Sequence, residues 1–269
     1  MNTQLALAVT KMHGTENVFG VIDERPPKTR DYAALAKRLC APDGDLGGAD
    51  GMLVIADAPG FAAEMQIYNA DGSRAEMCGN GVRCVARYLA ERGSGDAFTI
   101  ATLAGPIGVR VVSREPFEAC VDVGPVHFPN DARAETVTAM GVAWTFYDVS
   151  LGNPHAVIFV DDVNAIDVET LGVTLNWLER FADGTNVHVA DIVDRSTLRV
   201  RHYERGVGIT QACGTGAVAC AAAAITVRGA NSPVTVLVPG GTLLVEWAPG
   251  ENARLTGGAE TVFERTVIL

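Results

Sequence analysis

Two cysteines, Cys78 and Cys213, occupy segments of the same form, in which Cys-Gly-x-Gly precedes an apolar run: "MCGNGVRCVARYL" (77–89) and "ACGTGAVACAAAAI" (212–225). A helix N-terminus carries roughly +0.5 charge and can lower the pKa of a thiol from about 8.5 to ~3.5–7.5. Such a thiol can exchange protons at neutral pH. A lone free cysteine more often packs as a small hydrophobe, but the repetition favours the reactive interpretation for both.

Two facing thiols suit the inversion of a carbon centre, which requires a base on one face and an acid on the other. The carbon acid is weak, so the developing charge on a substrate carboxylate needs oriented dipoles. Free backbone N–H groups at the two helix entries can supply them; the alternative is a tight turn that merely tolerates glycine. The backbone groups concerned are those of Gly79, Asn80, Gly214 and Thr215.

Polar residues near the cysteines complete the candidate site. Asn69 and Glu204 each lie nine residues before a cysteine. Arg205 can bind a substrate carboxylate through two parallel N–H groups, and His155 can exchange a proton with a nearby thiol. Each has a structural alternative: a surface ion pair for the arginine, a backbone hydrogen bond for the histidine. The other candidates, for which turn geometry is the alternative, are Asn17, Asn153 and Asn186.

The cysteine segments belong to a longer internal duplication. They are 135 residues apart, about half of the 269-residue chain. Downstream, "TIATLAGPIGVRVV" (99–112) matches "VTVLVPGGTLLVEW" (234–247), each a strand, turn and strand; upstream, "GTENVFGVID" (14–23) matches "GNPHAVIFVD" (152–161). The sequence therefore predicts an α+β fold of two pseudo-symmetric domains, each a sheet around one central helix, with the active site in the cleft that separates them.

The two predicted helices differ in polarity. The first has apolar residues at i, i+3, i+4 and i+7, typical of a half-buried helix, and we expect Arg83, Arg87 and Arg92 to face solvent. The second is apolar on every side and should be enclosed. Cys84 and Cys220, inside these helices, are assigned to packing.

Composition restricts the partners. A net charge of −11 and a pI near 4.9 disfavour nucleic acid and anionic membranes. The N-terminus has no basic leader and no apolar run approaches a membrane span, so we expect a cytoplasmic protein with reduced thiols. No CxxC or HExxH spacing occurs, and no metal is expected. The predicted partner is a small molecule, with a homodimer left open.

The sequence resembles the diaminopimelate epimerase family over nearly its full length. The resemblance rests on segments in family order, of which the NADGS-to-CGNG block and the ERG-to-ACGTG block are the most specific. The other segments are "KMHGTENVFGVID", "GADGMLVI", "SLGNPHAVIFV" and "GTNVHV".

The resemblance implies that Cys78 and Cys213 interconvert LL- and meso-diaminopimelate, for lysine and peptidoglycan synthesis, without pyridoxal phosphate, metal or any other cofactor. It places His155 and Glu204 beside the thiols. It assigns Asn17, Asn69, Asn153, Asn186 and Arg205 to substrate binding, and the four backbone groups to the reacting carboxylate. It also implies two mostly antiparallel barrel-like domains: residues 1–123 joined by strand 261–269, and residues 124–260.

Two segments depart from the family pattern. In "HGTENVF", Glu16 and Val18 replace a glycine and an aspartate, and in "GITQAC", Ile209 stands where the family usually has glutamate. A second hypothesis therefore keeps the mechanism and changes the substrate to histidine, glutamate or another amino acid. A third, of a different class, is a redox sensor in which the two thiols form a disulfide.

Overall fold

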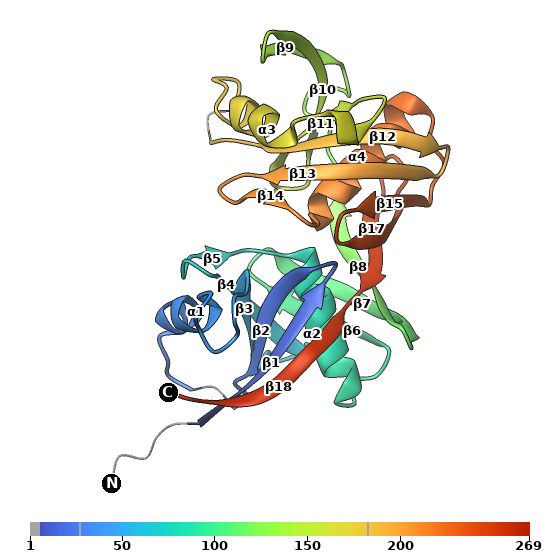
Figure 1. Ribbon diagram of the computed structural model, residues 1–269. Coiled ribbons are helices and arrows are strands. Elements are labelled where there is room, and N and C mark those ends of the chain that lie inside the picture. The colour runs from blue at the N-terminus through green and yellow to red at the C-terminus, as the bar shows by residue number, and fades with distance from the viewer. Residues whose placement is uncertain (1–5, 27, 182) are drawn as a thin grey trace. The chain divides into compact units, whose positions relative to one another are not determined.

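The computed structural model describes residues 6–26, 28–181 and 183–269 of the chain. The chain divides into two compact units: Met1–Val121 with Gly257–Leu269, and Asp122–Thr256. We call them unit 1 and unit 2. The chain leaves unit 1 within strand β8 (Phe117–Pro125) and returns within β17 (Asn252–Gly258) (Figure 1).

Unit 1 is a mostly antiparallel sheet with two helices. The pairs β1–β2, β3–β4, β6–β7 and β7–β8 are antiparallel, β2–β3 and β4–β6 are parallel, and β18 pairs antiparallel with β1. The last strand therefore joins the first unit. Besides β8, the elements are β1 (Ala6–Gly14), β2 (Asn17–Asp23), α1 (Tyr32–Cys40), β3 (Gly51–Ala56), β4 (Ala63–Asn69), β5 (Arg74–Ala75), α2 (Gly79–Glu91), β6 (Ala97–Thr102), β7 (Gly105–Arg114) and β18 (Glu260–Ile268).

Unit 2 repeats this pairing order. The pairs β10–β11, β12–β13, β13–β14 and β15–β16 are antiparallel, and β11–β12 and β13–β15 are parallel. The order of strands, helices and pairings confirms the predicted α+β duplication. The elements are β9 (Glu135–Ala139), β10 (Val142–Ser150), β11 (Pro154–Phe159), η1 (Val163–Ala165), α3 (Val168–Asn176), β12 (Asn186–Asp194), β13 (Thr197–Glu204), β14 (Gly208–Thr210), α4 (Gly214–Arg228), β15 (Val234–Val238) and β16 (Gly241–Glu246).

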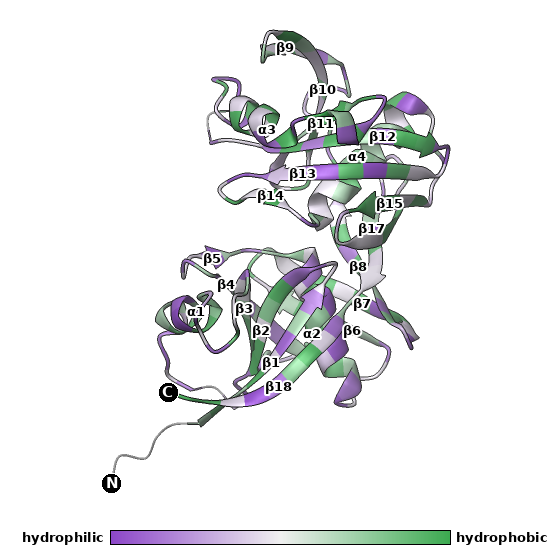
Figure 2. Cartoon of the chain, in the orientation of Figure 1, coloured by the Kyte–Doolittle hydropathy of each residue, from purple (hydrophilic) through white to green (hydrophobic). Residues whose placement is uncertain are grey.

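One central helix packs against the strands of each unit. Helix α4 is buried from Gly216 to Ala224, as its apolar sequence predicts. Helix α2 contacts β1 to β4 and β7, and it alternates hydrophilic and hydrophobic residues in Figure 2. Helices α1 and α3 were not predicted, although each begins with an aspartate cap: the carboxylates of Asp31 and Asp167 accept backbone N–H groups. No helix in the described ranges is long and apolar enough to cross a membrane.

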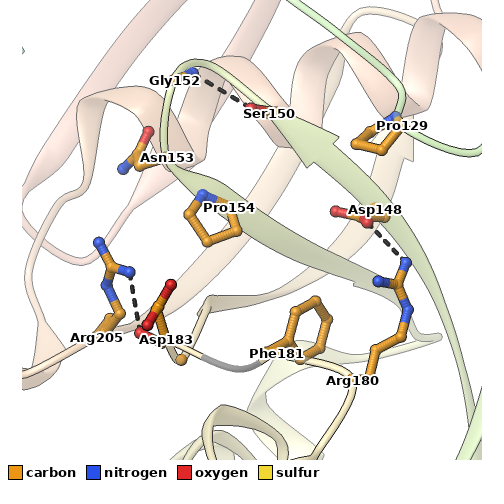
Figure 3. Close-up of a pocket in the computed structure, with 11 residues that line it drawn as sticks. Pro129, Asp148, Ser150, Gly152, Asn153, Pro154, Arg180, Phe181, Asp183 and Arg205 are labelled. Carbon is orange, nitrogen blue, oxygen red and sulfur yellow. Dashed lines mark hydrogen bonds and ion pairs between the residues drawn. The ribbon is translucent and has the colours of Figure 1, made fainter.

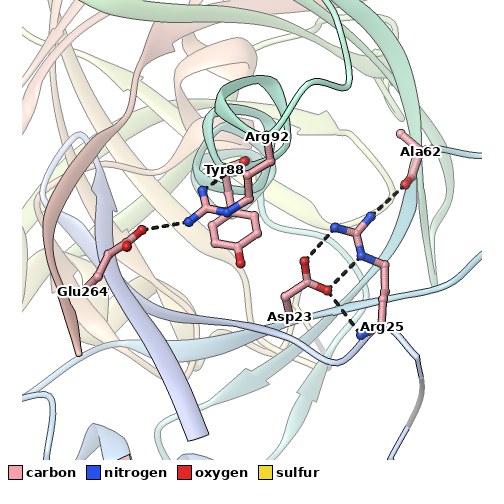
Figure 4. Close-up of polar contacts among 6 residues, drawn as sticks. All are labelled: Asp23, Arg25, Ala62, Tyr88, Arg92 and Glu264. Atoms are coloured by element: carbon pink, nitrogen blue, oxygen red, sulfur yellow. Dashed lines mark hydrogen bonds and ion pairs between the residues drawn. The ribbon is translucent and has the colours of Figure 1, made fainter. Parts of the chain in front are cut away.

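The expectation that the arginines of α2 face solvent is wrong for Arg83, which is 0% exposed. The returning end of the chain covers this face and supplies acceptors. Arg83 Nε donates to the carbonyl of Gly258 (3.1 Å) and Arg87 Nη1 to that of Ala259 (2.8 Å). Arg92, which follows α2, lies over the ring of Tyr88 and donates to Glu264 on β18 (Figure 4). The three arginines thus bind the returning end of the chain, from the end of β17 into β18.

A second arginine contact in Figure 4 fixes the end of β2. The guanidinium of Arg25 donates to both carboxylate oxygens of Asp23, at 2.8 and 2.6 Å, and to the carbonyl of Ala62 at 3.3 Å. This bidentate pair joins β2 to the segment that leads into β4.

Candidate functional site

Cys78 is the N-terminal cap of α2, as the sequence predicts. Its sulfur accepts the backbone N–H of Gly81 at 3.5 Å, and its S–H donates to Asn17 Oδ1 at 3.7 Å. Asn80 Nδ2 donates to the same Asn17 oxygen at 3.2 Å. The thiol is half-buried, so unit 1 brings Cys78, Gly79, Asn80 and Asn17 together at one helix entry.

A buried cation, Arg83, lies behind this helix entry. It donates to Asn80 Oδ1 (3.0 Å), to Thr15 Oγ1 (3.1 Å) and to the carbonyl of Gly79 (3.4 Å). Burial lowers the pKa of Arg83, and electrostatic interaction with the Cys84 and Cys78 sulfurs opposes that shift. Arg83 therefore holds the residues around the thiol. Sequence reasoning missed it because its helical position predicted solvent exposure.

The loop that presents Asn17 is strained. Thr15 and Glu16 have φ of 51° and 62°, in the left-handed region that glycine adopts most readily. Asp50, which sequence reasoning did not identify, accepts from Asn17 Nδ2 and from the backbone N–H of Val18, both at 2.7 Å. Glu16 and Val18, the two residues that depart from the family pattern, thus lie in a loop that hydrogen bonds to Asp50 hold in place.

Asn69 lies at the end of β4, next to this loop. The backbone carbonyl of Asp50 accepts the N–H of Ala70, and Asn69 Nδ2 donates to Ser73 Oγ at 2.9 Å. Asn69 therefore belongs to the same end of unit 1 as Asn17, although no direct contact joins their side chains among the described interactions.

Cys213 is the N-terminal cap of α4 and is 5% exposed. Its sulfur lies 3.7 Å from Thr215 Oγ1. Burial raises the pKa of the Cys213 thiol well above its ordinary value, and the Glu204 carboxylate raises it further, against opposing hydrogen bonds from Gly216 and Thr215. The raised pKa favours the protonated thiol at neutral pH, so the expectation that the helix N-terminus lowers the thiol pKa is wrong for Cys213. Glu204 lies beside it and accepts from Thr210 Oγ1 at 2.6 Å.

The remaining predicted residues of unit 2 form a connected set. Asn153 Oδ1 lies 3.0 Å from His155 Nε2. Asn186 donates to the carbonyl of Pro154 at 2.9 Å and accepts the backbone N–H of Arg205 at 3.0 Å. Burial, with the charges of His202 and Arg205, lowers the pKa of His155 to about 3, so its imidazole is neutral.

A pocket of about 430 Å³ opens in unit 2 (Figure 3). Two of the predicted residues, Asn153 and Arg205, line it, and Arg205 Nη1 donates to the carbonyl of Asp183 at 3.0 Å. Arg180 closes one side through ion pairs with Asp148 and Glu135. The pocket therefore offers a guanidinium and an amide to an anionic group. The lining residues are Pro129, Asp148, Ser150, Gly152, Asn153, Pro154, Arg180, Phe181, Asp183, Gly184 and Arg205.

The other cysteines are buried in the hydrophobic core. Burial raises the pKa of Cys84 to about 12 and that of Cys40 to about 11. Cys84 and Cys220 are both 0% exposed, which agrees with their assignment to packing. Within the described residues, no group of three or more histidine, cysteine or acidic side chains could hold a metal ion.

Comparison with known proteins identifies the family. The sequence model of the family described as diaminopimelate epimerase matches residues 9–129 and 147–262 of this chain. The chain belongs to the diaminopimelate epimerase family. A diaminopimelate epimerase from Moorella thermoacetica is 38% identical, covering 94% of this chain and 96% of its own. One from Desulforapulum autotrophicum is 39% identical, covering 96% and 98%.

Solved structures agree on the fold. A phenazine biosynthesis protein of the PhzF family from Bacillus anthracis matches 98% of this chain and 100% of its own, with a TM-score of 0.77 at 15% sequence identity. This similarity concerns the fold alone. Membership of the diaminopimelate epimerase family, together with the duplicated α+β architecture, classes the chain as an amino-acid epimerase that uses no pyridoxal phosphate.

Proposed function

We propose that this protein interconverts LL- and meso-diaminopimelate, with Cys78 and Cys213 as the two proton-transfer groups. The observation that carries the proposal is the equivalent position of the two thiols, each the cap of a central helix in one half of a duplicated fold. Full-length similarity to diaminopimelate epimerases supports the substrate. Unit 1 and unit 2 are then the N-terminal and C-terminal epimerase halves.

The different surroundings of the thiols suggest how the first proton moves. Cys213 is protonated and lies beside Glu204, so we assign it as the acid. Cys78 donates its S–H to Asn17 Oδ1 and accepts an N–H at a helix N-terminus; because the helix N-terminus stabilises a thiolate once that proton has left, we assign Cys78 as the base. Cys78 removes the α-proton while Cys213 protonates the opposite face of the carbon, which leaves a thiol at Cys78 and a thiolate at Cys213. The reverse reaction exchanges these roles.

The carbanion requires stabilisation while the proton is absent. We assign this role to the backbone N–H groups that open α2 and α4, those of Gly79, Asn80, Gly214 and Thr215. They are oriented before the reaction begins and face charge that develops on the reacting carboxylate. The requirement that a thiol reach each face of one α-carbon is the geometric condition of this mechanism.

The distal end of the substrate is assigned to the pocket of unit 2. Arg205 and Asn153 offer N–H donors there, and a guanidinium binds a carboxylate with two parallel hydrogen bonds. The side chain of Asn186 is engaged by Pro154 and Arg205, so we assign it to orienting Arg205. Asn17 and Asn69, which belong to unit 1, are assigned to binding the same substrate. His155 is assigned to the surroundings of Cys213. A cytoplasmic location stays a prediction.

A second candidate substrate is another amino acid, because Glu16 and Ile209 depart from the family pattern and both side chains are exposed. Proton-to-deuterium exchange at the α-carbon distinguishes the two. Reduced enzyme in D2O would be given LL-diaminopimelate or a panel of single amino acids and followed by NMR.

Exchange with inversion of diaminopimelate alone is the expected result. Exchange of a different amino acid would retain the mechanism and reassign the substrate, and no exchange with any compound would refute the epimerase proposal. Cys78→Ala and Cys213→Ala should each abolish inversion. Cys84→Ala and Cys220→Ala, which remove buried thiols from the same two helices, should retain it.

A further inference from the structure

Three histidines form a buried hydrogen-bonded row in unit 2. They lie on the neighbouring strands β11, β12 and β13 and are 0%, 0% and 1% exposed. His155 Nδ1 is 2.8 Å from His188 Nε2, and His188 Nδ1 is 2.8 Å from His202 Nδ1. Since His155 Nε2 also contacts Asn153 Oδ1, the row runs from the pocket wall into the core.

Unit 1 has the same positions without the histidines. Across β12 and β13, His188 pairs with His202; across β3 and β4, Leu53 pairs with Ile67. In each unit the first residue of this pair, Leu53 or His188, lies next to the second glycine of the Cys-Gly-x-Gly segment. A Cβ on Gly81 would lie 3.1 Å from Leu53, and a Cβ on Gly216 would lie 2.5 Å from His188. Leu53 and Ile67 are therefore the equivalents of the second and third histidines.

The first histidine has an apolar equivalent as well, in a strand register that differs by two residues from the sequence match of 14–23 with 152–161. His155 pairs with Asn186 across the parallel strands β11 and β12, as Phe19 pairs with Gly51 across β2 and β3. The apolar side chains at these three positions, Phe19, Leu53 and Ile67, are all buried. The fold therefore forms without imidazoles at these positions, and three buried polar rings in unit 2 need an explanation other than packing.

The contacts define where the protons lie. Asn153 Oδ1 can only accept, so His155 carries its proton on Nε2 and accepts at Nδ1 from His188 Nε2–H. His188 Nδ1 then accepts from His202 Nδ1–H. His202 Nε2 remains an acceptor without a partner among the described residues. The reverse order would leave a buried N–H donor unpaired at this end, which is the rarer and less favourable case.

We propose that His188 and His202 are positioning residues, which hold His155 in its Nε2–H form and thereby keep the amide N–H groups of Asn153 available to a substrate carboxylate beside Arg205. This inference rests on the proposed function. Burial lowers the pKa of all three histidines, so the order of donors and acceptors persists at neutral pH. The row thus fixes the Asn153 amide as a hydrogen-bond donor in the wall of the pocket. A fixed donor beside Arg205 favours the binding of an anionic group.

The test replaces the row with the residues of unit 1. His188→Leu and His202→Ile should fold, because the equivalent core of unit 1 has these side chains. His188→Gln is the matched control, since its amide can donate to His155 and accept from His202. Nitrogen-15 NMR of the unliganded proteins reports which nitrogen of His155 carries the proton, and steady-state kinetics with diaminopimelate reports binding.

We expect Nε2–H on His155 in the wild type and in His188→Gln, and loss of this single form in His188→Leu. KM should rise about tenfold in His188→Leu, with kcat within about twofold, because the lost interaction is one of binding. His202→Ile should show smaller changes of the same sign, and it provides the test if His188→Leu fails to fold.

Two results would overturn the inference: Nδ1–H on His155 in the wild type, or an unchanged proton position and KM in folded His188→Leu or His202→Ile. The NMR measurement needs no substrate. If the wild type fails to turn over diaminopimelate, the proposed function fails, and the proton position still decides whether the row holds His155.

Discussion

The second glycine of each Cys-Gly-x-Gly segment allows a matched experiment on the two units. Gly81 and Gly216 both lie in the first turn of a central helix, where alanine is favoured over glycine by ~1 kcal/mol. The two sites differ in what a new Cβ would meet. We predict that Gly216→Ala destabilises the protein and that Gly81→Ala is neutral or slightly stabilising.

The magnitude follows from the contacts. A Cβ at residue 216 would lie 2.5, 2.8 and 2.9 Å from three ring atoms of His188, whereas favourable contacts are about 3.5–4.0 Å. The ring would have to move by about 1 Å, and it is hydrogen-bonded on both sides. Overpacking costs ~1–3 kcal/mol and each lost hydrogen bond ~1 kcal/mol. Set against the helix preference, the net destabilisation is about 1–3 kcal/mol.

At residue 81 the nearest atom is the end of the Leu53 side chain, at 3.1 Å. A shift of a few tenths of an ångström relieves this contact, so the helix preference decides the sign. Thermal unfolding followed by circular dichroism should show a Tm lower by roughly 3–9 °C for Gly216→Ala and little change for Gly81→Ala. Equal losses in the two variants, or a larger loss at residue 81, would refute the reasoning.

Three further predictions concern charge, pH and strain. Glu204→Gln removes a carboxylate that raises the pKa of Cys213, so alkylation of Cys213 by iodoacetamide, followed by mass spectrometry, should begin at a lower pH than in the wild type; an unchanged onset would contradict the coupling. The row histidines have folded pKa values below the ordinary value of 6.5, so the stability they contribute is present above about pH 6.5 and is lost as the pH falls toward 3. Urea unfolding should therefore show that the unfolding free energy falls less between pH 7 and pH 5 in the His188→Leu, His202→Ile double variant than in the wild type, by up to ~2.7 kcal/mol per pH unit. Equal slopes would count against a neutral row. Glu16 has φ of 62°, so Glu16→Gly should stabilise the protein by about 1 kcal/mol; a lower Tm would show that this side chain makes contacts worth more than the strain.

Local patterns made part of the molecule predictable. The cysteine caps of α2 and α4 follow from a glycine-rich entry before a helical run, and the hairpins β6–β7 and β15–β16 follow from two strands around a Gly/Pro turn. These features depend on residues close together in the chain. The duplication could also be predicted from the sequence, because both halves repeat the same order of such patterns. Helices α1 and α3 were missed, since their main local signal is a single aspartate cap.

The sequence by itself therefore determined the two thiols, the helix entries that present them and the repeat that relates them. Only the tertiary structure decided what surrounds them. Arg83 is buried because a strand from the end of the chain covers its helix face, which helical periodicity cannot anticipate. His188 and His202 occupy ordinary alternating strand positions, and they meet because the register of β12 and β13 places them opposite each other. Contacts of this kind join residues that are far apart in the sequence, so no local pattern specifies them.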